Sequence, residues 1–209
     1  MNTHLHILEA YTNLYRVWRD EELSRQLRNL ILIFTENIVN PATRHLDLFF
    51  DENWSSKSKI VSYGHDIEAS WLIDEAARIL GDEILLADVR KICIAIAEAA
   101  CDGLQADGSL VYEKDISTGH VDKDRHWWVQ AEGVVGFINA YELTGNEEWL
   151  KKALKCWSYI SKNLIDRSGK EWFWSISDDG MANLKEDKAG FWKCPYHNSR
   201  MCLEVQMRE

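Results

Sequence analysis

The apolar residues of this chain recur at helical spacing along nearly its whole length. Leucine, isoleucine and aromatic residues return three or four positions apart, which is the pattern of a helix with one buried face. This periodicity predicts an all-α fold with about seven helices. The expected helices lie near residues 5–18, 23–34, 65–80, 83–104, 128–143 and 147–164, with a seventh that begins after Pro195 and runs to the end.

The connections between these helices alternate between short and long. Short ones carry an acidic start for the next helix, as in Gly81-Asp82-Glu83, where glycine ends one helix and the acidic residues favour the next. Long, aromatic ones cover residues 38–62, 105–126 and 165–194, and residues 48–50 and 172–174 within them are candidates for short strands. This alternation is typical of stacked helical hairpins.

Composition narrows the class of protein. The chain has 209 residues and a formal net charge of −10, which disfavours nucleic acid as a partner because phosphate binding depends on clustered lysine and arginine. It has no apolar stretch of membrane-spanning length, and its first residues lead us to expect no signal peptide. Five cysteines without metal-type spacing indicate reduced thiols and a cytoplasmic location. No cofactor motif is present, and we expect no bound metal.

Polar and aromatic side chains occupy equivalent places in successive hairpins. His6, His65, the pair Trp127-Trp128, and His197 each lie near the start of the first helix of a pair. If the hairpins curve into a ring, these positions meet at one mouth. Flat aromatic faces beside hydrogen-bonding groups are suited to binding a sugar.

Four separated segments, in order, resemble a known family. They are residues 2–11, residues 62–72 with Tyr63-Gly64-His65-Asp66, Trp127-Trp128 through Glu132, and residues 192–198 with Pro195-Tyr196-His197. They are similar to the cellobiose 2-epimerases of the N-acylglucosamine 2-epimerase superfamily. The resemblance implies an (α/α)6 barrel, an isomerase activity and a small carbohydrate substrate.

That family builds its barrel from about twice as many residues. We therefore expect residues 1–209 to form a partial (α/α)6 barrel domain, the C-terminal part, without the N-terminal half that contributes an arginine and a tyrosine to the family's sugar site. A half ring exposes apolar helix edges, which favour self-association or pairing with the missing half.

The resemblance also implies a reaction and two central residues. It points to epimerisation at carbon 2 of the reducing-end glucose of cellobiose-type β-1,4-disaccharides, giving mannose through an enediolate. His65 and His197 would remove and return the proton, a task that suits a side chain with a pKa of about 6.5. The resemblance adds His6 and Asn2, which share one helix face and would hydrogen-bond the enediolate oxygens.

The remaining expected site residues are acidic or aromatic. Glu68 is expected to orient His65 or to bind a sugar hydroxyl, and Glu132 lies on the same helix face as Trp128. The sugar platform implied by the resemblance consists of Trp127, Trp128 and Trp192. Arg200 is interpreted as structural.

Other interpretations of these motifs stay open at this point. A metal site built from His6, His65, Glu68 and His197 is the sharpest rival. Within the same enzyme class the alternatives are an N-acylglucosamine or mannose 2-epimerase, or an aldose–ketose isomerase. Outside it, the alternative is an inactive fragment that binds sugars.

Overall fold

The computed structural model describes residues 1–208, and its α-helices match the seven that the periodicity predicts. The predicted fourth helix ends in a short 3-10 turn at residues 101–103, and the second and sixth end in π turns at 34–38 and 160–164. The helices are α1 (Asn2–Val17), α2 (Glu21–Ile33), α3 (Tyr63–Leu80), α4 (Glu83–Ala100), α5 (Trp127–Thr144), α6 (Glu147–Tyr159) and α7 (Tyr196–Met207).

Side-chain caps begin the second helix of each hairpin, as the short connections predict. Asp20, Asp82 and Asn146 each accept a hydrogen bond from a backbone N–H in the first turn of the helix that follows. Gly81 and Gly145 end α3 and α5 in the left-handed conformation, with φ of 81° and 66°. Local sequence therefore sets the length of these helices.

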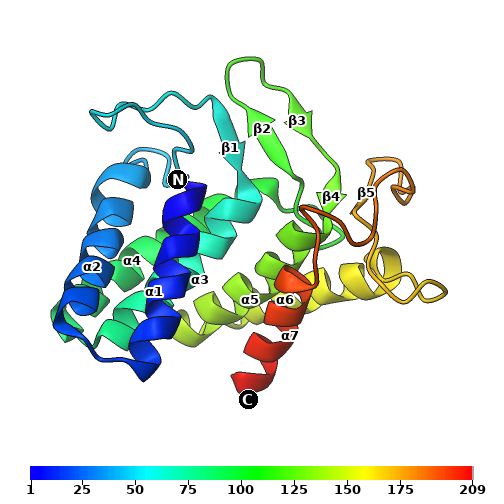
Figure 1. The fold of residues 1–209 in the computed structure, drawn as a ribbon. Helices are drawn as coiled ribbons and strands as arrows, with labels where there is room; N and C mark the ends of the chain where they lie inside the picture. Colours follow the sequence, from blue (N-terminus) through cyan, green and yellow to red (C-terminus); the bar gives the residue numbers. More distant parts are fainter. Residues whose placement is uncertain (209) are drawn as a thin grey trace.

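The helices form two layers along a curved arc (Figure 1). In the inner layer α1 packs on α3, α3 on α5 and α5 on α7, while in the outer layer α2 lies against α1 and α3, α4 against α3 and α5, and α6 against α5. The core fills the space between the layers, where Phe34, Trp71 and Phe137 are completely or almost completely buried. All four inner helices begin at the same end of the molecule.

Two small antiparallel sheets flank that end. The first joins β1 (Ile60–Ser62), β2 (Glu113–Asp115) and β3 (Val121–Asp122), and the second joins β4 (Arg125–His126) to β5 (Ser175–Ile176). Strands β1 and β4 run directly into α3 and α5, so each sheet sets the position of an inner helix's first turn.

The two aromatic segments that were candidates for strands do not form strands. They contribute only the isolated bridges Phe50–Ser56 and Ile165–Trp172. The reason is local, because Asp51 and Asp166 accept hydrogen bonds from backbone N–H groups two residues further on and turn the chain there.

Large apolar side chains are exposed on α1, α6 and α7. Val17 and Trp18 at the end of α1 are 85% and 56% exposed, and Leu154 on α6 and Leu203 on α7 are 59% and 58% exposed. Among residues 1–208, no helix combines the length and the apolar character needed to cross a membrane.

Candidate active site

A cavity of about 470 Å³ opens where the inner helices begin. The structure brings every predicted site residue to it except Glu132, which lies directly beneath. His4, two residues before His6, does not line the cavity and packs against Trp54 with 5.7 Å between ring centroids. The cavity is lined by Asn2, His6, His65, Glu68, Tyr112, His126, Trp127, Trp128, Trp174, Trp192, Tyr196 and His197.

His65 lies in the first turn of α3 and lines the cavity. Its Nδ1 lies 2.8 Å from the Ser62 hydroxyl, and its ring lies 4.8 Å from that of Trp128. Burial, together with the nearby His6 and His197, lowers the pKa of His65 to about 4. The imidazole is therefore neutral at pH 7.

His197 sits in the first turn of α7 with a carboxylate behind it. Its Nδ1 lies 2.8 Å from Oε1 of Glu132, and the centroid of its ring lies 5.5 Å from that of Trp128. Glu132 is 1% exposed and also accepts a hydrogen bond from Trp71. A buried carboxylate on one ring nitrogen leaves the other nitrogen as the basic one.

Arg200 joins the two buried glutamates of the site. Its Nη2 donates to Glu68 at 2.5 Å and to Glu132 at 2.7 Å. Burial and the nearby Glu132 raise the pKa of Glu68. Burial would also raise the pKa of Glu132, but Arg200 and His197 outweigh it, so that pKa is lowered.

This network bears on two expectations from the sequence. Glu68 was expected to orient His65 or to bind a sugar hydroxyl; its carboxylate pairs with Arg200 and lies 3.9 Å from His197, so it does not orient His65, while its place in the cavity lining keeps the second role a prediction. Arg200 was interpreted as structural, and it pairs with both buried glutamates without lining the cavity. Its position three residues after His197, on the same helix face, is the signal that pointed to it.

A third acidic side chain links the network to α1. Glu9 of α1 accepts hydrogen bonds from Arg200 at 2.8 Å and from the Tyr196 hydroxyl, both on α7. Burial opposes ionisation of Glu9, but hydrogen bonds from His6, Tyr196 and Arg200 lower its pKa to about 2. The hydrogen bond to Glu9 raises the pKa of His6. Neither Glu9 nor Tyr196 was predicted from the sequence.

Aromatic rings form the walls of the cavity. Trp127 and Trp128 are nearly buried, whereas Trp192 is 80% exposed at the mouth. Tyr112 stacks on His126 with 4.0 Å between centroids, and Trp174 packs against Trp127 at 4.6 Å. Tyr112, His126 and Trp174 come from the long connections, and none of these three was predicted as a site residue.

The metal-site alternative is tested by the positions of the ligand atoms. Among residues 1–208, one group of three or more histidine, cysteine or acidic side chains has its ligand atoms within 4.8 Å of one another, and it consists of Glu68, Glu132 and His197. His6 and His65, which the alternative requires, lie outside that group. Both carboxylates already pair with the guanidinium of Arg200, which supplies the positive charge that an ion would bring.

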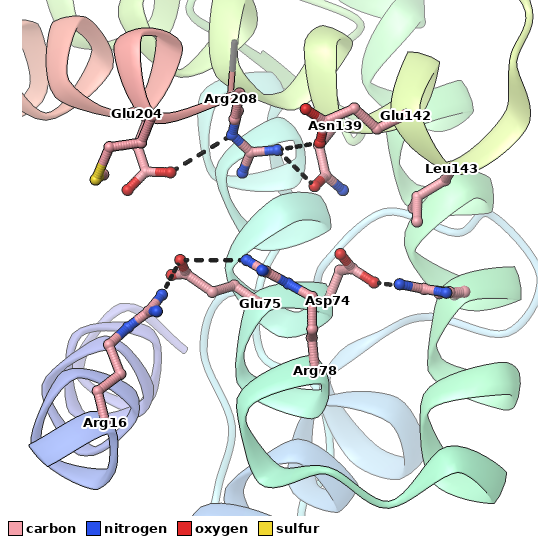
Figure 2. Close-up of a pocket in the computed structure, with 11 residues that line it drawn as sticks. Arg16, Asp74, Glu75, Arg78, Asn139, Glu142, Leu143, Glu204 and Arg208 are labelled. Carbon is pink, nitrogen blue, oxygen red and sulfur yellow. Dashed lines mark hydrogen bonds and ion pairs between the residues drawn. The ribbon is translucent and has the colours of Figure 1, made fainter.

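A second cavity, also about 470 Å³, lies between the C-terminal halves of the same four inner helices (Figure 2). Its walls carry ion pairs rather than aromatic rings. Arg16 of α1 pairs with Glu75 of α3, and Arg208 binds Asn139 at 3.1 Å and Glu142 at 2.5 Å on α5. These contacts tie the helices together at the end away from the histidines.

The comparisons with known proteins agree with this architecture. Residues 1–200 match the model of the N-acylglucosamine 2-epimerase (GlcNAc 2-epimerase) family. The chain is 58% identical over 205 residues to a cellobiose 2-epimerase of Bacteroides fragilis, covering 98% of this chain and 52% of that protein. It is 42% identical over 209 residues to the cellobiose 2-epimerase of Ruminococcus albus, covering 100% of this chain and 53% of that protein.

Solved structures give the same result. A cellobiose 2-epimerase from Bacillus thermoamylovorans superposes with a TM-score of 0.94 at 48% identity, covering 100% of this chain and 53% of the other. A D-mannose isomerase superposes with a TM-score of 0.85 at 18% identity, which shows the shared α/α-barrel fold. The chain spans about half the length of the curated relatives it matches. It belongs to the N-acylglucosamine 2-epimerase family.

Proposed function

We propose that this chain carries the proton-transfer half of a carbohydrate 2-epimerase site, acting on the reducing-end glucose of cellobiose-type disaccharides. One observation carries the proposal. His65 and His197 both contact the ring of Trp128 within a single cavity, yet their environments differ strongly. A reaction that removes a proton from one face of a carbon and returns one to the other needs two such groups.

The environments suit a pair that shares one proton. His65 is neutral at pH 7 because its pKa is lowered to about 4, so its free nitrogen can accept a proton. His197 faces buried Glu132 through Nδ1, and since a carboxylate can only accept, the other ring nitrogen is the one left to exchange a proton with the sugar. Once the open-chain aldehyde is formed, one histidine removes the carbon-2 proton and the other protonates the enediolate from the opposite face. The bound epimer decides which acts first.

The other lining residues have supporting roles in this proposal. Asn2 and His6 face the cavity from α1 and would donate hydrogen bonds to the enediolate oxygens, where negative charge develops. Trp127 and Trp128 would pack against the sugar ring, and exposed Trp192 at the mouth would stack on the second sugar. The preference for a disaccharide therefore rests on Trp192.

The test uses cellobiose in deuterated water and follows carbon 2 by NMR. Exchange of the carbon-2 proton together with a mannose-type product is expected, and His65→Asn and His197→Asn should each reduce product formation at least about 100-fold. His120→Asn is the control, because His120 is exposed on the β2–β3 hairpin. Sugar binding without exchange would contradict the proposal and favour a sugar-binding function.

Two further arms keep this test informative. Because the chain spans about half of its relatives, the reaction is run with the chain alone and with the N-terminal half of the Bacteroides fragilis enzyme added. Exchange only in the mixture would mean that the remaining part of the ring completes the site. Parallel reactions with mannose and N-acetylglucosamine identify the preferred sugar.

A further inference from the structure

Ser62 occupies the N-cap position of α3 but does not cap the helix. Serine at this position ordinarily accepts a hydrogen bond from a backbone N–H of the first turn. Here the side chain makes no capping bond, and its hydroxyl lies 2.8 Å from Nδ1 of His65. The hydroxyl therefore hydrogen-bonds the imidazole instead of the helix backbone.

The position of this hydroxyl is set by the fold around it. Ser62 is 2% exposed and is the last residue of β1, where it pairs with Glu113 of β2. The next residue already belongs to α3. With no loop between strand and helix, the sheet holds the hydroxyl at a constant place relative to His65.

The partner on Nδ1 decides which form of a neutral imidazole is present. Such a ring carries one N–H, and the nitrogen that bears it is set by its hydrogen-bond partner. A hydroxyl can accept from Nδ1–H or donate to a bare Nδ1, so the distance alone permits both forms. His197 differs, since the carboxylate of Glu132 can only accept.

The reaction under "Proposed function" requires one of these forms. To remove the carbon-2 proton, Nε2 of His65 must hold a lone pair, so the single N–H must lie on Nδ1. The proton taken from carbon then makes an imidazolium, whose Nδ1–H still donates to the same hydroxyl. When the enediolate is protonated from this side, Nε2 returns the proton, and the neutral Nδ1–H form is restored.

We propose that Ser62 is a positioning residue that accepts a hydrogen bond from Nδ1–H of His65 and so holds the Nε2 lone pair toward the sugar. This inference rests on the proposed function for its purpose, but the hydrogen-bond state it specifies exists without any substrate. It explains why the hydroxyl of a buried N-cap serine is diverted from the helix.

The decisive measurement is ¹⁵N NMR of the histidine rings in the 209-residue chain at pH 7. The ¹⁵N chemical shift of each ring nitrogen depends strongly on whether that nitrogen carries a proton. We expect His65, assigned by its loss in His65→Asn, to carry its proton on Nδ1 in the unchanged chain and in Ser62→Thr. In Ser62→Ala a large share of the Nε2–H form should appear.

Ser70→Ala is the matched control, because Ser70 is another buried serine of α3 whose hydroxyl bonds the backbone oxygen of Ile67 at 2.7 Å. It should leave the His65 signals unchanged. The inference would be overturned if His65 of the unchanged chain carried its proton on Nε2. It would also be overturned if Ser62→Ala left the proton on the same nitrogen as in the unchanged chain.

A kinetic readout separates this inference from the proposed function. If the chain exchanges carbon-2 protons, Ser62→Ala should lower kcat about 10- to 100-fold with KM nearly unchanged, and Ser62→Thr should recover most of it. If no sugar is turned over, the proposed function fails while the NMR result still decides the role of Ser62. A large rise in KM with kcat unchanged would instead place Ser62 in sugar binding.

Discussion

Replacing Arg200 tests whether the charge network under the cavity is as tightly balanced as its geometry indicates. Arg200 is 10% exposed, and Glu68 and Glu132, the two carboxylates that share its Nη2, are each 1% exposed. In Arg200→Gln both carboxylates lose their shared positive partner. The variant keeps a polar side chain but leaves two buried negative charges close together.

The size of the effect follows from the distances. Carboxylate atoms of Glu68 and Glu132 lie within 4.8 Å of each other. At an effective dielectric constant of about 20, their repulsion is roughly 3 kcal/mol. Removing one partner of a buried ion pair costs about 3–5 kcal/mol by general experience. The two figures agree, so we expect the free energy of unfolding at pH 7 to fall by about 3–5 kcal/mol.

The loss should depend on pH in a definite direction. Without Arg200, the pKa of Glu68, already raised by burial and Glu132, rises further. A raised folded-state pKa favours the folded state at low pH and disfavours it as pH rises through that value. The stability deficit of Arg200→Gln should therefore be largest at pH 7 and smaller near pH 5.

Urea unfolding followed by tryptophan fluorescence measures this at both pH values. Arg25→Gln is the control, because Arg25 and its partner Glu22 are both exposed on α2, and it should leave the unfolding midpoint almost unchanged. Adding Glu68→Gln to Arg200→Gln should restore part of the lost stability. A deficit below about 1 kcal/mol, or one that does not change with pH, would refute the balanced-network interpretation.

Three further changes test other parts of the structure. In Gly64→Ala the new Cβ would lie 2.5 Å from Trp128, so the ring must move, and carbon-2 exchange should fall about 10-fold or more in the NMR assay. Because the pKa of His65 is lowered to about 4, the folded state resists its protonation, and stability should fall by roughly 3 kcal/mol as pH drops from 6.5 to 4. Urea unfolding across that range should show a flatter dependence in His65→Asn. Asp66 is fully buried and bonds both His45, at 2.7 Å, and the backbone of the 39–59 connection. Asp66→Asn should therefore lower the free energy of unfolding by about 1–3 kcal/mol and speed amide hydrogen exchange in that connection. Unchanged exchange would count against this anchoring role.

The parts of the molecule that were predictable from sequence are those governed by local rules. Helical periodicity located all seven helices, and caps such as Asp82 located their starts. The repeat of hairpins placed His6, His65 and His197 at equivalent positions, and the curvature of the arc brings them to one cavity. Family resemblance supplied the roles that spacing alone left open.

The parts that were missed depend on contacts between distant segments. Tyr196 bonds Glu9 across 187 residues, and no local pattern marks either side chain as a partner of the other. Tyr112 and Trp174 reach the cavity from long connections whose paths are set by single bridges and short strands. Glu68 seemed to belong to His65 because three residues separate them, but the stronger attraction of a buried guanidinium directs its carboxylate to Arg200.

The central claim is that His65 and His197 act as a pair on one carbon atom. It is tested most directly by following both cellobiose and its mannose-type epimer in deuterated water with the chain, supplemented where needed by the N-terminal half of its relative. We predict that the unchanged chain interconverts the two epimers and incorporates deuterium from the solvent at carbon 2. His65→Asn and His197→Asn should each stop the interconversion in both directions. Continued interconversion by either variant would contradict the paired mechanism.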